Sequence, residues 1–127
     1  MMKDTNVLIA DDSPEMLGFI RSLLNDKRLK LHAAEDGLEA LDVFYREEID
    51  IVVSDFDMPG LDGLTLASIV KENRGEKRCP FILMSGWDLP DERLKSANLF
   101  AFLKKPFSVI DFKELVKSAI DFTGTEK

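Results

Sequence analysis

The chain has 127 residues, 45% of them hydrophobic, which suits one domain with a core of ordinary size. Its 17 Lys and Arg against 24 Asp and Glu give a net charge of −7, and no basic run could neutralise a row of phosphates, which argues against direct nucleic-acid binding. The single cysteine, Cys79, excludes an internal disulfide, and no segment has the apolar length of a signal peptide or a membrane span, so we expect a cytoplasmic protein with no membrane partner.

Short apolar runs alternate with helical patterns along the chain, which is typical of βαβ units around a parallel sheet. The first strand is predicted at 7–10. Ser13 and Pro14 then mark the start of a helix whose apolar positions share one face. The second predicted strand, 29–33, alternates apolar with polar residues and therefore belongs at a sheet edge.

The remaining segments continue the alternation. Helices are predicted at 37–45 and 63–73, a weaker one at 91–95 and a last one around 112–120, with strands at 51–53, 81–84 and 100–103. The strands at 51–53 and 81–84 are continuous apolar runs, as expected for strands covered on both faces. We expect one domain over residues 1–127, with a core of about 5–122 and a polar tail at 123–127.

Right-handed crossovers and an edge second strand predict the strand order 2-1-3-4-5, a flavodoxin-like, doubly wound (βα)5 fold of the α/β class. In this order the direction of winding reverses between the first and third strands, and ligands bind at that crevice, outside the carboxyl ends of the strands. Asp11 and Asp12 follow the first strand and Asp55 ends the third. We therefore expect three carboxylates to converge on the crevice.

Carboxylates crowded in this way need a positive partner. Two unit negative charges about 4 Å apart repel by roughly 4 kcal/mol at an effective dielectric constant of about 20. Hard carboxylate oxygens without nearby His or Cys favour Mg²⁺ over zinc or copper, and the main-chain carbonyl of Asp57 is a further candidate ligand. The sequence thus predicts a magnesium site.

Two more groups are expected at the same edge of the sheet. The fourth strand runs into Ser85 and the fifth into Lys104, Lys105 and Pro106. Three acids, one Mg²⁺ and one lysine sum to zero charge, and a hydroxyl can help to solvate an added phosphoryl group. This balance suits aspartyl-phosphate chemistry, with a carboxylate as the nucleophile.

Four motifs together resemble one known family. They are Asp11-Asp12, Asp55-Phe56-Asp57-Met58-Pro59-Gly60 with Asp62-Gly63, Ser85-Gly86, and Lys105-Pro106-Phe107, each following its own strand. Each motif alone is weak evidence, but their order and spacing over the whole chain are specific. The chain resembles the receiver domain of two-component response regulators, of the stand-alone single-domain type.

The resemblance implies a role for each matching residue. Asp55 would be the phosphoacceptor, receiving the group from a phosphohistidine on a histidine kinase or phosphotransfer protein, or from a small phosphodonor. Mg²⁺ would be bound directly by Asp12 and Asp55, by the Asp57 main-chain carbonyl, and through water by Asp11. Lys105 would contact the phosphoryl group.

The resemblance also implies a switch. Ser85 occupies the family's Ser/Thr switch position, and Phe102 matches the aromatic switch on the fifth strand. The Lys105-Pro106 peptide would be cis. The output would pass through the face made by the fourth helix, fifth strand and fifth helix to a downstream protein effector in trans, and the chain would catalyse only its own phosphorylation and dephosphorylation.

Some positions depart from the family pattern or have a simpler interpretation. Asn98-Leu99 replaces the usual Gly-Ala before the fifth strand, which makes output less predictable than phosphorylation. Asp57 and Trp87 occupy positions that tune access of water to the phosphoryl group. Asp12, with Glu15 three residues later, could instead cap the first helix. His32 is expected to be exposed, Lys104 to be a solvated neighbour of Lys105, and Cys79 to lie in a loop or at the start of a strand.

Two other functions remain open at this stage. A haloacid-dehalogenase-type phosphatase also combines acids, a hydroxyl and a lysine, but it needs its D-x-D motif on the first strand and its acid pair late in the chain. A receiver-like docking module that phosphorylation does not regulate is the second alternative, because Asn98-Leu99 is unusual.

Overall fold

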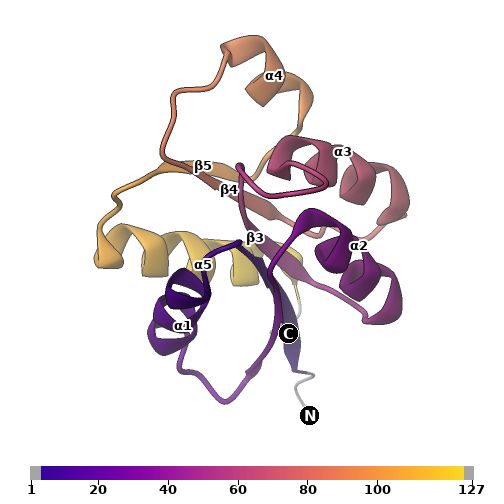
Figure 1. Ribbon diagram of the computed structural model, residues 1–127. Helices are drawn as coiled ribbons and strands as arrows, with labels where there is room; N and C mark the ends of the chain where they lie inside the picture. Colours follow the sequence, from indigo (N-terminus) through magenta and orange to yellow (C-terminus); the bar gives the residue numbers. More distant parts are fainter. Residues whose placement is uncertain (1–3, 125–127) are drawn as a thin grey trace.

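The computed structural model describes residues 4–124 as a 5-stranded parallel sheet with helices between the strands (Figure 1). The strand order is β2-β1-β3-β4-β5, and every neighbouring pair is parallel, which confirms the predicted topology. The elements in chain order are β1 (Thr5–Ala10), α1 (Pro14–Leu23), β2 (Leu29–Ala34), α2 (Gly37–Arg46), β3 (Ile51–Asp55), α3 (Gly63–Asn73), β4 (Phe81–Ser85), α4 (Asp91–Ser96), β5 (Ala101–Lys104) and α5 (Val109–Thr123).

The predicted boundaries are close to the observed ones, with small differences at the ends. β5 begins at Ala101 rather than at residue 100 and extends to Lys104. α5 continues through Thr123, the first residue of the predicted tail, and ends at Gly124, whose φ of 74° is readily available only to glycine. Residues 125–127 of that tail lie outside the described residues.

Two layers of helices cover the sheet, with α1 and α5 on one face and α2, α3 and α4 on the other (Figure 1). Successive side chains of a strand point to opposite faces, so neighbouring residues of one strand enter different cores. Val53 packs with the α1 and α5 side chains, whereas Val52 packs with those of α2 and α3. All residues of β3 and β4 are buried, as their continuous apolar runs predicted.

Side chains at the helix starts satisfy backbone N–H groups that have no partner within the helix. Ser13 accepts from the N–H of Met16 at 3.2 Å, and Asp62 accepts from the N–H of Thr65 at 2.8 Å. Ser13 is therefore the N-cap of α1, as predicted, and the alternative in which Asp12 caps this helix is wrong. The 6-residue α4 has neither a capping side chain nor a buried residue, in agreement with its weak pattern.

A close approach of two backbones positions the end of β3. The Gly63 N–H donates to the carbonyl of Phe56 at 2.8 Å, and a Cβ at Gly63 would lie 2.4 Å from the carbonyl oxygen of Asp55. Only glycine leaves room for this contact. The start of α3 is thus packed directly against the backbone that carries Asp55.

Candidate phosphorylation site

Three carboxylates meet at the carboxyl ends of β1 and β3. Asp11 and Asp12 follow β1, and Asp55 is the last residue of β3. One oxygen from each lies within 4.8 Å of the others, which confirms the predicted convergence. Asp11 and Asp55 are 1% and 7% exposed, whereas Asp12 is exposed. A cation at this position would therefore meet two buried acids and one that faces solvent.

Lys105 supplies the positive charge of the cluster. Its Nζ lies 3.2 Å from Asp11 Oδ2 and 3.2 Å from Asp55 Oδ1. Burial lowers the pKa of Lys105, but attraction by Asp11 and Asp55 outweighs burial, and the net effect raises the pKa. The amine is therefore an ammonium at neutral pH and holds the two carboxylates together.

Lys105 is oriented by its own backbone. Its N–H donates to the Ser85 carbonyl at 2.8 Å, which continues the pairing of β4 and β5, and its peptide bond to Pro106 is cis, as the resemblance implied. Lys104, in contrast, is exposed, and its Nζ lies 2.6 Å from Asp88 Oδ1. Lys105, and not Lys104, is therefore the lysine that lies beside Asp11 and Asp55.

The charges in the cluster do not cancel. Burial raises the pKa of Asp55, repulsion by Asp11 raises it further, and attraction by Lys105 only partly offsets both. Three carboxylates and one ammonium leave a formal charge of −2. Oxygen ligands with this residual charge fit one hard divalent cation.

Asp11 and Asp12 differ in how much of their carboxylate is already in use. Asp11 Oδ1 accepts from the Ser13 N–H at 2.9 Å, and Oδ2 contacts Lys105, so both oxygens have partners. Asp12 makes no hydrogen bond or ion pair within residues 4–124. This asymmetry suits the expectation that Asp12 binds a cation directly and Asp11 through water.

Ser85 lies at the same edge of the sheet but is turned toward its own loop. Its Oγ donates to the Trp87 carbonyl at 3.1 Å and accepts from the Trp87 N–H at 2.9 Å. The side chain is buried, whereas Trp87 is 66% exposed. To donate to a group on Asp55, the Ser85 hydroxyl has to give up its hydrogen bond to the Trp87 carbonyl, because it has only one proton to donate.

The other predicted positions are placed as follows. Asp57 is exposed, and Phe102 is half-buried against the core under α2 and α3. Cys79 lies just before β4, as predicted, and is buried. The expectation that His32 is exposed is wrong, because its Nε2 lies 3.1 Å from Asn6 Oδ1 and the ring is half-buried.

Sequence reasoning missed a contact behind the site. Arg93 of α4 lies 3.6 Å from the carboxylate of Asp62, and its guanidinium stands 5.7 Å from the centre of the Phe56 ring. Arg93 thereby links α4 to the loop that follows Asp55. No pattern in the sequence pairs residues of a short, weakly amphipathic helix with a loop about 30 residues earlier.

A comparison with known families decides the identity of the chain. The model of the "Response regulator receiver domain" family matches residues 7–117, which include all three acids and Lys105. The chain belongs to this family. It is therefore a receiver domain of two-component systems, with the phosphoacceptor role of that family, and neither the haloacid-dehalogenase type nor the docking-only module is favoured.

Relatives of this receiver domain include short and long proteins. Chemotaxis protein CheY-3 of Vibrio cholerae is 28% identical over 115 residues, which are 88% of each chain. The probable transcriptional regulator ycf29 of Pyropia yezoensis is 27% identical over 80% of this chain, and the sensor histidine kinase TmoS of Ectopseudomonas mendocina is 32% identical over 90% of it. The chain spans only 46% of ycf29 and 12% of TmoS.

Solved structures agree with the family assignment. The Francisella response regulator 1452 receiver domain has 31% sequence identity and a TM-score of 0.82, covering 94% of this chain and 99% of that one. Receiver domains are signalling domains that bind Mg²⁺ at an acidic pocket, are phosphorylated by histidine kinases and act on downstream effectors. In the part of the chain that the structure describes, no helix is long and apolar enough to cross a bilayer.

Proposed function

We propose that Asp55 is the phosphoacceptor of this receiver domain and that Lys105 holds the transferred group. The observation that carries the proposal is the position of Lys105 Nζ, 3.2 Å from both Asp11 and Asp55 at the carboxyl ends of the strands. A buried carboxylate at a strand end, next to a residual negative charge and an ammonium, is suited to become an acyl phosphate.

In the reaction, a carboxylate oxygen of Asp55 attacks the phosphorus atom of a phosphohistidine. The P–N bond breaks, the imidazole leaves with the electron pair and takes up a proton, and a mixed anhydride forms on Asp55. Lys105 then exchanges its contact with Asp55 Oδ1 for a phosphoryl oxygen, which carries more negative charge. A small phosphodonor such as acetyl phosphate can replace phosphohistidine in the same displacement.

The donor set fits Mg²⁺ as the cofactor. Asp12, Asp55 and the Asp57 main-chain carbonyl would hold the ion, and Asp11 would contact it through water. When bound, Mg²⁺ supplies the positive charge that offsets the crowded carboxylates and the phosphoryl oxygens. The protein's own part is to hold the nucleophile and the lysine in place before the donor arrives.

Phosphorylation would then change the loop after β4 and the helix that follows it. Ser85 would leave Trp87 and donate its hydroxyl to a phosphoryl oxygen, and Phe102 would move inward as Ser85 vacates its position. α4 has no buried residue in the described structure, so little packing opposes its displacement. The face made by α4, β5 and α5 is the proposed contact for a downstream protein in trans.

The donor and the compartment follow from this chemistry. A histidine kinase or a phosphotransfer protein would supply phosphohistidine, in the cytoplasm, and the chain would catalyse only its own phosphorylation and dephosphorylation. We further propose that residues 1–127 form one domain, and that this domain binds neither nucleic acid nor a membrane directly.

Intact-mass measurement after incubation with acetyl phosphate and Mg²⁺ tests the assignment. The wild-type chain is expected to gain one phosphoryl group, and Asp55→Asn is expected to gain none. Asp57→Asn is the matched control, because Asp57 would contribute only its main-chain carbonyl, and this variant should still be phosphorylated. Phosphorylation of Asp55→Asn at the wild-type level would contradict the role of Asp55.

A further inference from the structure

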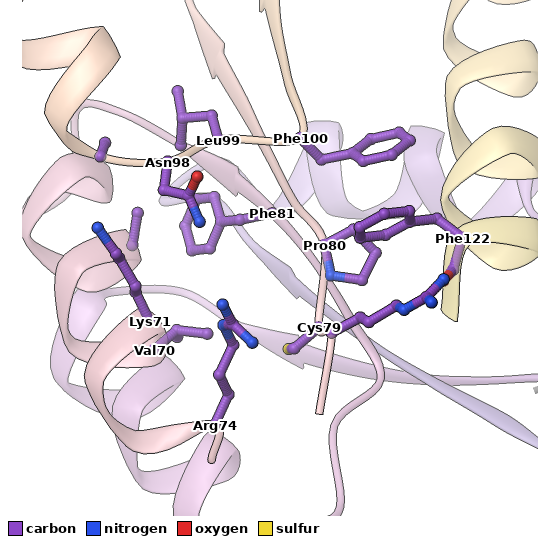
Figure 2. Close-up of a pocket in the computed structure, with 13 residues that line it drawn as sticks. Val70, Lys71, Arg74, Cys79, Pro80, Phe81, Asn98, Leu99, Phe100 and Phe122 are labelled. Atoms are coloured by element: carbon purple, nitrogen blue, oxygen red, sulfur yellow. The ribbon is translucent and has the colours of Figure 1, made fainter. Parts of the chain in front are cut away.

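A cavity of about 270 Å³ lies at the amino ends of β4 and β5, at the opposite end of the sheet from the acids (Figure 2). The C-terminal part of α3 forms one wall and contributes Lys71 and Arg74. Phe122 near the end of α5 stands on the other side, and the segment 98–100, which leads into β5, crosses above (Figure 2). The proposed phosphorylation chemistry uses none of these residues.

The charge of the cavity is opposite to that of the molecule. Its lining includes three cations, Lys71, Arg74 and Arg78, and no Asp or Glu among the described residues, although the chain as a whole carries −7. Lys77, which lies between these residues in the sequence, is paired with Asp50 at 2.8 Å and is outside the lining. The local excess of positive charge is therefore specific to the cavity.

The three cations differ in how far they are already engaged. Arg78 donates to the Phe122 carbonyl at 2.9 Å and stands 5.2 Å from the centre of that ring, so its role is to hold α5. Arg74 is half-buried and donates to the Lys77 carbonyl, and neither Arg74 nor Lys71 has a carboxylate partner within residues 4–124. A half-buried guanidinium favours an anionic partner, because burial removes part of the water that would otherwise solvate its charge.

The floor of the cavity is apolar. Phe100 and Phe122 are in contact, with ring centres 5.2 Å apart, and Phe81 and Val70 also line the cavity, Val70 from the α3 side (Figure 2). An occupant must therefore combine an apolar body with a negative group, because either part alone would leave half of the surface unmatched.

The backbone around the cavity is strained. Cys79 and Asn98, at φ of 36° and 55°, are the non-glycine residues with positive φ within residues 4–124, and both line the cavity. Such conformations are unfavourable for residues that have a side chain, and they persist where the surroundings impose them. Asn98 belongs to the Asn98-Leu99 pair that departs from the family pattern, so the departure lies in the wall of this cavity.

We infer that this cavity binds a small organic anion, an aromatic or aliphatic body bearing a carboxylate or phosphate, whose charge lies between Arg74 and Lys71. Ligand pockets in proteins have volumes of about 300–1,000 Å³. At about 270 Å³ this cavity is slightly smaller than that range, which favours a compact anion over a nucleotide. The apolar body would lie against Phe81 and Phe100.

The test uses the whole chain in EDTA without phosphodonor, so that it does not depend on the proposed phosphorylation. Titration with 3-phenylpropionate is followed by the shifts of backbone amide signals in ¹H–¹⁵N spectra. We expect saturable shifts at residues 70–74 and 97–100. The uncharged analogue 3-phenyl-1-propanol and inorganic phosphate, which each supply one half of the ligand, should bind far more weakly.

Two variants and one control locate the charge. Arg74→Gln should weaken binding of 3-phenylpropionate by about tenfold, as expected for loss of a charge-assisted hydrogen bond. Lys71→Gln should weaken binding less, because the Lys71 side chain is exposed. Arg21→Gln on the other face of the sheet changes the net charge equally and should leave binding unchanged. Circular dichroism would show whether each variant is folded.

The proposal is overturned if 3-phenyl-1-propanol binds as tightly as the acid, or if the shifts map to the acid cluster. It is also overturned if Arg21→Gln weakens binding as much as Arg74→Gln does, because the effect would then be one of net charge. Binding of the peptide Asp-Glu-Phe-Asp without binding of 3-phenylpropionate would assign the cavity to an acidic protein segment and would likewise overturn it.

Discussion

Asp55 carries a charge that opposes folding in the metal-free protein. Its pKa in the folded state is raised by burial and by Asp11, so the native state binds this proton more tightly than the unfolded chain does. The contribution of Asp55 to the free energy of unfolding therefore falls as pH rises from the unfolded pKa of about 3.9 through the higher folded pKa.

Replacing this carboxylate should stabilise the fold. In EDTA, we expect Asp55→Asn to raise the free energy of unfolding at pH 7.5 by about 1 kcal/mol, because the cost of burying the charge, together with its repulsion by Asp11, exceeds the lost attraction to Lys105. The gain should be smaller at pH 4, because wild-type Asp55 takes up its proton as the pH is lowered. Thermal unfolding at the two pH values measures it, and a lower stability of Asp55→Asn at pH 7.5 would contradict this electrostatic interpretation.

Cys79 is a residue whose chemistry the fold suppresses. Burial raises the pKa of its thiol to about 11, with small opposing effects from Lys77 and Asp50, and its Sγ lies 3.7 Å from the Ile49 carbonyl. The nucleophilic thiolate is therefore scarce at neutral pH. Alkylation by iodoacetamide at pH 8 should be at least about tenfold slower in the native protein than in urea. Equal rates measured by mass spectrometry would show that the thiol is accessible.

The start of α3 is the element that fixes the position of Asp55. A Cβ at Gly63 would overlap the Asp55 carbonyl oxygen, so Gly63→Ala must push the helix away from β3. We expect a loss of about 1–3 kcal/mol in stability, as for other overpacked positions, together with slower phosphorylation by acetyl phosphate. Urea unfolding and intact-mass kinetics measure the two effects.

Gly18 in α1 provides the matched control. No atom lies within 4 Å of the position that its Cβ would take, and the helical backbone there suits alanine. Gly18→Ala should therefore stabilise the protein by about 0.5–1 kcal/mol and leave phosphorylation unchanged. If both substitutions had the same effect, close packing at Gly63 would not explain the role of that glycine.

The elements themselves were largely predictable, because their signals are local. The continuous apolar run of β3 and β4 and the alternation in β2 each fix a burial pattern, and right-handed crossovers then leave one strand order. Convergence of Asp11, Asp12 and Asp55 follows from that order alone. Lys105 could be chosen over Lys104 only because it adjoins Pro106 in the family's motif, since both lysines are at the same strand end.

The parts that sequence did not predict depend on rotamers and on distant contacts. A serine hydroxyl can turn either way, so the bonds of Ser85 to Trp87 carry no sequence signal. The contact of Arg93 with Asp62 joins two elements whose distance depends on packing. The cavity beside Arg74 likewise arises from three elements that meet only in the folded chain.

At the scale of the whole molecule, the acid cluster and the cavity at the other end of the sheet carry opposite charge. The carboxyl ends hold three acids around one lysine, and the amino ends of β4 and β5 hold three cations without an acid in the cavity lining. Strand β5 connects the two, since Asn98 precedes it and Lys105 follows it. Phosphorylation is proposed at the acid cluster, where the formal charges of the three carboxylates and Lys105 sum to −2.

Calorimetric titration of the phosphate-free protein with Mg²⁺ tests that account most directly. We expect saturable binding of one ion, accompanied by a rise in the melting temperature, because the ion offsets repulsion among buried carboxylates. Asp12→Asn should weaken the binding, whereas Asp57→Asn, which keeps the main-chain carbonyl, should retain most of it. Absence of saturable Mg²⁺ binding to the wild-type chain, or binding that Asp12→Asn leaves intact, would contradict the proposed site.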